Sequence, residues 1–206
     1  MDLFWGTDYE FINYKPDARL EPGRWCNSAC IEILNKRLEE LRKPRMSSSV
    51  VLKKLRRYAR SLVHEGNEGL GRFVYMLHLI KFYFPADTAP KFLLDISLIK
   101  EMLQGGNYPM LKFAIGFNPE IATLRDSNND NLLHLLVNSG KSESEIDTFI
   151  RYLLWNSPLK DAVRVTLLYQ KNHDRKRPMK IAKEKQLFIL MESVKTYLIA
   201  KDYYKE

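Results

Sequence analysis

The chain has 206 residues, of which 45% are hydrophobic and 28% are charged, and its formal net charge is +8. This composition fits one compact domain or two tightly packed subdomains, and it excludes a disordered chain, because apolar residues occur along nearly the whole length. Two basic regions, 51–100 and 151–200, flank an acidic region, 101–150, so the charge favours anionic partners at particular surfaces.

We expect a cytoplasmic or nuclear protein that is not secreted and has no membrane partner. Residues 1–15 carry acidic side chains where a signal peptide carries basic ones. The most apolar stretch, 73–84, is too short to cross a bilayer and is interrupted by polar residues. Cys26 and Cys30 cannot form a disulfide framework, so a reducing compartment is expected.

The first segment, 1–25, is rich in aromatic and turn-forming residues and has neither a helical nor a strand period. One interpretation is an extended arm whose aromatic side chains anchor on the body of the protein. The alternative is an arm that becomes ordered only on a partner.

Three helices are predicted between residues 26 and 92, which we interpret as an N-terminal helical subdomain. Ser28 is a suitable N-cap for a helix to about Lys43, and a second helix starts after the serines at 47–49. The second helix has one apolar stripe, with five basic residues mainly on its other side: Lys53, Lys54, Arg56, Arg57 and Arg60.

The third predicted helix, about Leu70 to Tyr83, follows two punctuating glycines, Gly66 and Gly69, and is apolar on most sides. It should therefore be central to the core. Prolines at 85 and 90 close the segment. No part of the chain alternates polar and apolar residues as a strand does, so the predicted class is all-α.

Two segments in the second half of the chain share a pattern. Residues 126–136 read DSNNDNLLHLL, and residues 172–182 read NHDRKRPMKIA. Each has an Asp/Asn-rich turn followed by the start of an apolar helix. A weaker match at 110–126 looks like an outer helix and the loop that leads into the next turn.

These segments resemble the ankyrin-repeat family, whose signature runs approximately Asp-x-x-Gly-x-Thr-Pro-Leu-His-x-Ala. The resemblance implies about three degenerate helix-pair repeats over residues 93–200, at 94–124, 125–169 and 171–198, followed by a charged tail at 201–206. It also implies that His134 ties adjacent loops together by hydrogen bonds. The last outer helix, with its polar end, would form the C-terminal cap.

The pattern departs from the family at several positions. Asn129, Arg175 and Gln186 stand where glycine is usual, Leu132 replaces the proline, and Lys180 replaces the histidine. The two signatures begin 46 positions apart, at 126 and 172, whereas ankyrin repeats are about 33 residues long. The additional residues fall at about 157–170, after an outer helix expected at 146–155.

No catalytic, metal or cofactor site is predicted. The two cysteines lack the second ligand pair that a structural zinc site requires. The four histidines have no nucleophile arrangement around them, and Gly105-Gly106-Asn107 lacks the ending of a phosphate loop. We therefore expect a protein that is not an enzyme.

The resemblance implies a protein–protein interaction module that binds through the concave face and hairpin tips. The candidate partner-binding residues lie at the two tips: Asn128, Asn129, Asp130, His173, Arg175, Lys176 and Arg177. A partner with an acidic patch is expected. Short, degenerate ankyrin proteins occur in viruses and intracellular bacteria as inhibitors of host signalling, and the resemblance extends to such a role.

Two alternatives remain open. The first is a nucleic-acid-binding adaptor that uses the basic helix at 51–60, with Lys53, Lys54, Arg56, Arg57 and Arg60 as anion-binding residues, and the basic cluster at 171–185. The second is a self-assembling structural protein in which the aromatic arm is the assembly element. The sequence does not fix the oligomeric state.

Overall fold

In a computed structural model of the chain, the described residues are 32, 36, 48–84 and 88–202. They form ten α-helices and no strand, which confirms the all-α class for this part of the chain. The predicted arm, both cysteines and nearly all of the predicted helix at 28–43 lie outside the described residues. The chain divides into two compact units, Met1–Asn118 and Pro119–Glu206. The sequence-based boundary at residue 93 falls inside the first unit.

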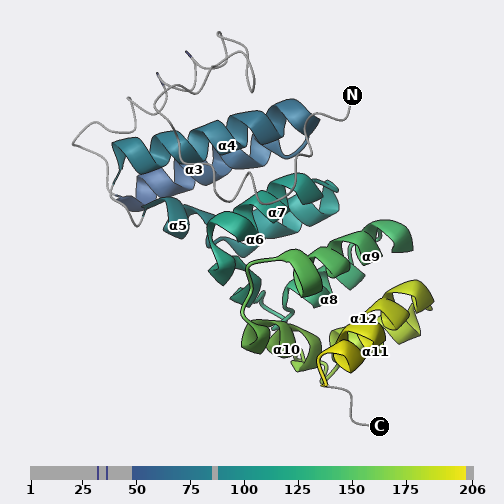
Figure 1. Cartoon of the computed structure of the whole chain (residues 1–206). Helices are drawn as coiled ribbons and strands as arrows, with labels where there is room; N and C mark the ends of the chain where they lie inside the picture. The colour runs from purple at the N-terminus through teal and green to yellow at the C-terminus, as the bar shows by residue number, and fades with distance from the viewer. Residues whose placement is uncertain (1–31, 33–35, 37–47, 85–87, 203–206) are drawn as a thin grey trace. The chain divides into compact units, whose positions relative to one another are not determined.

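The described part of the first unit consists of α3 (Ser48–Leu62), α4 (Gly66–Tyr83), α5 (Thr88–Leu93), α6 (Ile96–Gln104) and α7 (Tyr108–Phe117). Helices α3 and α4 lie side by side, as do α6 and α7 (Figure 1). In addition, α3 packs on α6 and α4 packs on α7, so the two helix pairs stack in the same order. Their apolar faces form a core that includes Leu62, Phe73 and Phe92, all fully buried.

Gly69 explains the close approach of α3 and α4. We expected it to precede the second of these helices, but α4 begins at Gly66 and contains Gly69 in its first turn. A Cβ atom at Gly69 would lie 2.1 Å from the carbonyl oxygen of Leu62, at the end of α3. The glycine therefore permits a backbone contact that any other residue would block.

The second unit begins with a 3₁₀ turn, Pro119–Thr123, and continues with α8 (Leu132–Val137), α9 (Glu143–Arg151), α10 (Asp161–Tyr169), α11 (Pro178–Glu184) and α12 (Phe188–Ala200). Helices α8 and α9 form one pair and α11 and α12 form another, with α8 packed on α11 and α9 on α12 (Figure 1). The side chains of Leu133, Phe149, Leu190 and Tyr197 are buried between them.

Most of the additional residues at 157–170 form helix α10, Asp161–Tyr169. A π-helical turn, Tyr152–Asn156, extends α9 and leaves carbonyl groups for other partners. The Arg164 side chain, on α10, donates to the carbonyl oxygens of Leu153 and Ser157 at 3.3 and 2.7 Å. The insertion therefore forms a helix that is tied to the end of α9.

Helix α12 is followed by exposed polar residues, as predicted, and it also exposes apolar side chains. Its terminal residues, Lys201 and Asp202, are exposed and polar as expected. However, its outer face carries Phe188, Ile189 and Ile199, which are 66%, 54% and 53% exposed. No helix in the described part of the chain is long and apolar enough to span a bilayer.

Candidate functional site

The candidate site is built from two loops with the same backbone geometry. In the first, the Asp126 amide donates to the carbonyl oxygen of Asp130, and the Asn129 amide donates back to that of Asp126. In the second, Asn172 and Lys176 make the same pair, and Arg175 donates to Asn172. Asn129 and Arg175 both adopt positive φ, 58° and 56°. A short turn with one left-handed residue therefore closes each loop.

An acidic or amide side chain at the start of each loop stabilises the turn. The Asp126 carboxylate accepts from the amides of Asn128 and Asp130 at 2.9 and 2.8 Å. The Asn172 carbonyl oxygen, Oδ1, accepts from the amide of Lys176 at 3.0 Å. These contacts satisfy backbone donors that a tight turn would otherwise leave unpaired.

The two loops are joined directly. The His173 amide donates to the carbonyl oxygen of Asn128 at 3.0 Å. The Asn172 side-chain amide donates to the Asp130 carboxylate at 2.8 Å, and this contact is buried. The side-chain amide of Asn129 donates to the carbonyl oxygen of Lys171 at 3.2 Å. The loops therefore hold each other in a fixed relation.

His134 adds a buried contact beneath this loop pair. It is 0% exposed, and its Nε2 lies 2.9 Å from the carbonyl oxygen of Lys176. Because a carbonyl oxygen only accepts, Nε2 carries the proton. Nδ1 lies 3.2 Å from the amide nitrogen of Asn131 and 2.8 Å from the Asn131 side-chain oxygen, Oδ1. His134 thus makes the loop-to-loop contact that the resemblance implied.

These contacts separate six of the seven predicted tip residues, all except Lys176, into two groups. Asp130 is only 8% exposed, and its carboxylate binds Asn172 within the loop pair. The side chains of Asn128 and Asn129 also bind within the loops, so these three residues position the tip. By contrast, His173, Arg175 and Arg177 are exposed. Their side chains are therefore the ones that a partner can reach.

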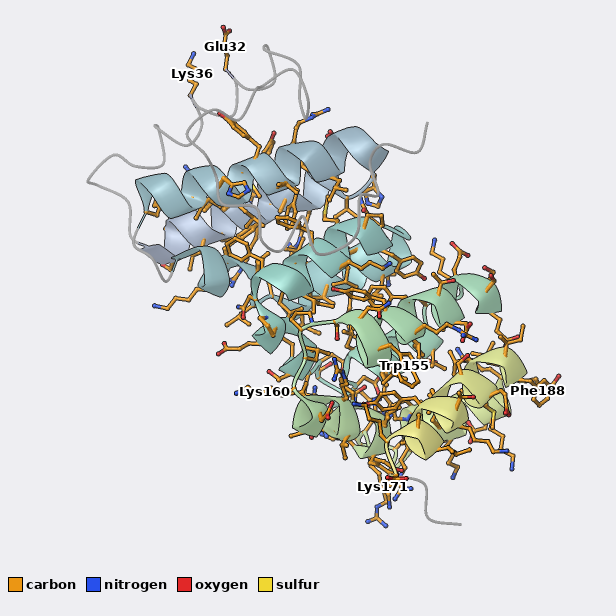
Figure 2. All side chains as sticks on the ribbon, in the orientation of Figure 1. Glu32, Lys36, Trp155, Lys160, Lys171 and Phe188 are labelled. Carbon is orange, nitrogen blue, oxygen red and sulfur yellow. The ribbon has the colours of Figure 1, made fainter. Side chains whose placement is uncertain are left out.

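A shallow hollow of about 450 Å³ opens beside the second loop. It is lined by four cationic side chains and one methionine, and we call this set the basic tip: Lys171, Arg175, Arg177, Lys180 and Met179. No carboxylate lines the hollow. Lys171, labelled in Figure 2, lies in the segment between α10 and α11. Such a concentration of positive charge around a concavity attracts anions.

Tyr169 and Glu184 each contact a cation at or beside the basic tip. The Arg177 guanidinium lies over the ring of Tyr169, 5.4 Å from its centroid, which orients the cation by a cation–π contact. Lys176, in contrast, binds the Glu184 carboxylate at 2.6 Å and does not line the hollow. The hydrogen bond from Lys176 lowers the pKa of Glu184, although the small desolvation of that carboxylate acts in the opposite direction.

The structure also divides the five cations predicted on the basic helix. Arg56 donates to the carbonyl oxygens of Lys91, Phe92 and Leu94 at distances of 2.9 to 3.1 Å. Arg60 pairs with Asp95 at 3.4 Å and with Glu101 at 3.2 Å. These two arginines hold the first unit together, and the exposed cations of this set are Lys53, Lys54 and Arg57.

The sequence missed Met179 and Tyr169 as parts of the candidate site. Met179 follows the helix-starting Pro178, and Tyr169 ends α10, so neither carries a signal that separates it from a core residue. Among the described residues, no group of three His, Cys, Asp or Glu side chains is placed to hold a metal ion. The chain matches no protein-family model, no curated protein and no solved structure.

Proposed function

We propose that the chain is a non-enzymatic protein-binding module of divergent ankyrin-type repeats, and that its basic tip binds an acidic surface of a partner protein. The observation that carries the proposal is the basic tip itself. Four cations surround one hollow. Three of them are on a loop whose backbone is fixed by a neighbouring loop, and the fourth, Lys180, is in the first turn of α11.

The spacing of backbone features supports the repeat assignment. Helices α8 and α11 start at residues 132 and 178, 46 positions apart, as do the left-handed residues Asn129 and Arg175. Asn129, Arg175 and Gln186, which stand where the family has glycine, all have positive φ, between 56° and 59°. These three positions thus adopt a backbone conformation that favours glycine, although none of them is a glycine.

The rigidity of the tip favours binding through it. A loop that is already ordered loses little conformational entropy when a partner docks, so more of the charge attraction appears as affinity. Arginine is also common among the residues that dominate binding energy at protein interfaces, because its planar guanidinium pairs with two carboxylate oxygens at once. Arg175 and Arg177 are placed for such pairing.

The test reverses charge in the basic tip without disturbing the fold. Lys171, Arg175 and Arg177 change to Glu together. Lys176 and Lys180 stay, because the positive charges of both act on the Glu184 carboxylate, and reversing either would put a second carboxylate beside it and destabilise α11. The matched control reverses three exposed cations elsewhere, Lys53→Glu, Arg57→Glu and Lys183→Glu. Each triple variant lowers the formal net charge from +8 to +2, so differences between them report on position.

We expect wild type and control to capture the same protein from a cell extract, and the tip variant to bind it at least about tenfold more weakly. Titration of the captured protein at two salt concentrations gives the affinities. Equal binding by the tip variant would remove the tip from the site. Binding to duplex DNA or RNA that falls steeply with salt, and that both triple variants weaken, would instead support the nucleic-acid alternative.

A further inference from the structure

The outer face of α12 has an ordered pattern of side chains. Four residues at positions i, i+4, i+7 and i+11 are all exposed, and we call them the outer stripe: Phe188, Glu192, Lys195 and Ile199. At about 100° per residue they fall within a sector of roughly 60°. The buried residues of the helix, Leu190, Ser193, Val194 and Tyr197, occupy the opposite side.

The outer stripe is self-complementary when it is read in opposite directions. It is apolar at both ends and charged in the middle, with the acid nearer the N-terminus and the base nearer the C-terminus. If two copies of α12 cross in antiparallel orientation about their midpoint, Phe188 faces Ile199 of the other copy. Glu192 then faces Lys195 of the other copy, and the symmetry repeats both contacts.

We propose that the outer stripe is a dimerisation surface that pairs with the outer stripe of a second copy of this chain, with the two α12 helices antiparallel. The contact would be isologous, as two-fold symmetry requires. It would bury Phe188 and Ile199, which are 66% and 53% exposed in the single chain. Figure 2 shows the Phe188 side chain projecting away from its helix.

The packing of the second unit leaves the outer stripe of α12 exposed to solvent. Helix α12 packs on α9 and α11 within its unit, and the side chains of its outer stripe are exposed. Helix pairs that stack in one direction bury each apolar face against the next pair. A second copy would supply the layer that the stack lacks.

A groove beside the outer stripe widens the surface. It has a volume of about 320 Å³ and lies between α9 and α12, where Trp155 and Ile189 line it. Trp155, in the π-helical turn, is 44% exposed. Its ring packs edge-on against that of Tyr197, with 5.2 Å between the ring centroids. Even so, one crossing of two helices this short is at the low end of specific interfaces, below about 1,200 Å² in total, so we expect reversible association in the micromolar range or weaker.

Charge exchange within the outer stripe tests both the contact and its direction. Glu192→Lys alone puts lysine opposite lysine, and Lys195→Glu alone puts glutamate opposite glutamate, so each should weaken association at least about tenfold. The double exchange restores both pairs and should associate like wild type. An equimolar mixture of the two single variants should also associate, because every facing pair is then opposite in charge.

Sedimentation equilibrium from about 10 μM to 1 mM, the range in which a small interface dissociates, measures the mass against the 24.3 kDa of one chain. Lys183→Glu changes the net charge in the same way as Lys195→Glu and is the control for that variant, and it should leave the association constant unchanged. Phe188→Ala with Ile199→Ala should abolish association without lowering the unfolding temperature, because both side chains are exposed. The tip triple variant should dimerise like wild type, so this test and that of the tip fail independently.

Three outcomes would overturn the proposal. One is a wild-type chain that stays monomeric up to about 1 mM, beyond the range expected for even a weak specific dimer. Another is dimerisation that survives both the apolar and the single-charge variants, which would assign the contact to a different surface. The third is loss of association in the double exchange as well as in the single ones, because an antiparallel pairing restores complementarity there.

Discussion

Single residues in the left-handed region determine how the helices of this protein are joined. Asn129, Arg175 and Gln186 adopt positive φ, which costs a residue with a Cβ atom about 1–2 kcal/mol relative to the right-handed region. Asparagine tolerates this region better than arginine or glutamine does, because its side chain bonds to nearby backbone. The side-chain amide of Asn129 donates to the carbonyl oxygen of Lys171, and this bond offsets the backbone strain at Asn129. Gln186 is exposed, so its side chain gains little from packing to offset the same strain.

Gln186→Gly should therefore stabilise the protein. The change removes the left-handed penalty, and after the greater flexibility of glycine in the unfolded chain is subtracted, we expect a gain of about 0.5–1 kcal/mol in the free energy of unfolding. Urea denaturation followed by circular dichroism measures it. Lys183→Gly, also exposed but inside α11, should destabilise the protein by about 1 kcal/mol. The argument fails if both glycine substitutions raise, or both lower, the free energy of unfolding.

Residues at the tips show where a single sequence is informative. The Asx-rich turns at 126–130 and 172–176, and the bonding role of His134, could be predicted because the relevant residues are close in sequence or carry a known signature. That Asp130 faces inward could not, because its partner Asn172 is 42 positions away. An aspartate on a loop has the same local signal whether it faces solvent or a buried amide.

Short helices depend on side chains from other elements. Helix α5 has only six residues, and helices of that length are unstable alone. The Arg56 guanidinium, from α3, donates to the carbonyl oxygens of Lys91 and Phe92 at the end of this helix and of Leu94 just beyond it. The end of a helix leaves its last carbonyl groups without donors inside the helix. The sequence placed Arg56 on a basic face because periodicity locates a side chain on a helix without revealing what packs against it.

Arg56→Met should lower the stability of the first unit by about 2 kcal/mol. The change keeps the apolar stem but leaves the carbonyl oxygens of Lys91, Phe92 and Leu94 without the charged donor, and bonds of this kind contribute about 1.5–3 kcal/mol. The neighbouring Arg57→Met is the control, since Arg57 is exposed and should change stability by less than about 0.5 kcal/mol. Chemical denaturation of both variants gives the comparison, and equal effects would contradict it.

The start of α9 makes one element sensitive to acid. Ser142 and Glu145 form a reciprocal cap, in which the serine side chain and then its backbone amide lower the pKa of Glu145 below the ordinary 4.5. A carboxyl whose folded pKa is depressed stabilises the fold above the unfolded value, and this contribution is lost as the pH falls through the folded value. The cap should therefore weaken in a window that begins near pH 4.5.

Glu145→Gln should make stability depend less on pH below about 4.5, because the glutamine cannot titrate. Thermal unfolding between pH 3 and 7, a range that spans the ordinary carboxyl pKa, measures this slope. Ser142→Ala should reduce the slope similarly, since it removes the cause of the lowered pKa. The double variant should add little to either change, because both residues act in one cap. A slope identical to that of wild type in all three would contradict the assignment.

For the molecule as a whole, helical periodicity predicted the all-α class and the approximate ranges of α3, α4 and α12. It did not predict α10, which lies in what the sequence suggested was an insertion, because only the contact of Arg164 with the end of α9 explains its position. Nor did it predict the boundary at Asn118, since that boundary depends on which helices contact one another across the chain. Long-range packing has no local signature in one sequence.

The main-chain hydrogen bond from His173 to Asn128 has a consequence for how this protein can change over generations. The tip is held by backbone atoms and by buried Asn172 and His134, while the outward side chains of His173, Arg175 and Arg177 take no part in those bonds. In the proposed binding role, replacing these three alters which partner the loop binds and leaves those hydrogen bonds in place. The residues that hold the loop in place are therefore different from the residues proposed to contact a partner. Natural variation, or a combinatorial library, can change the second group while the first is kept.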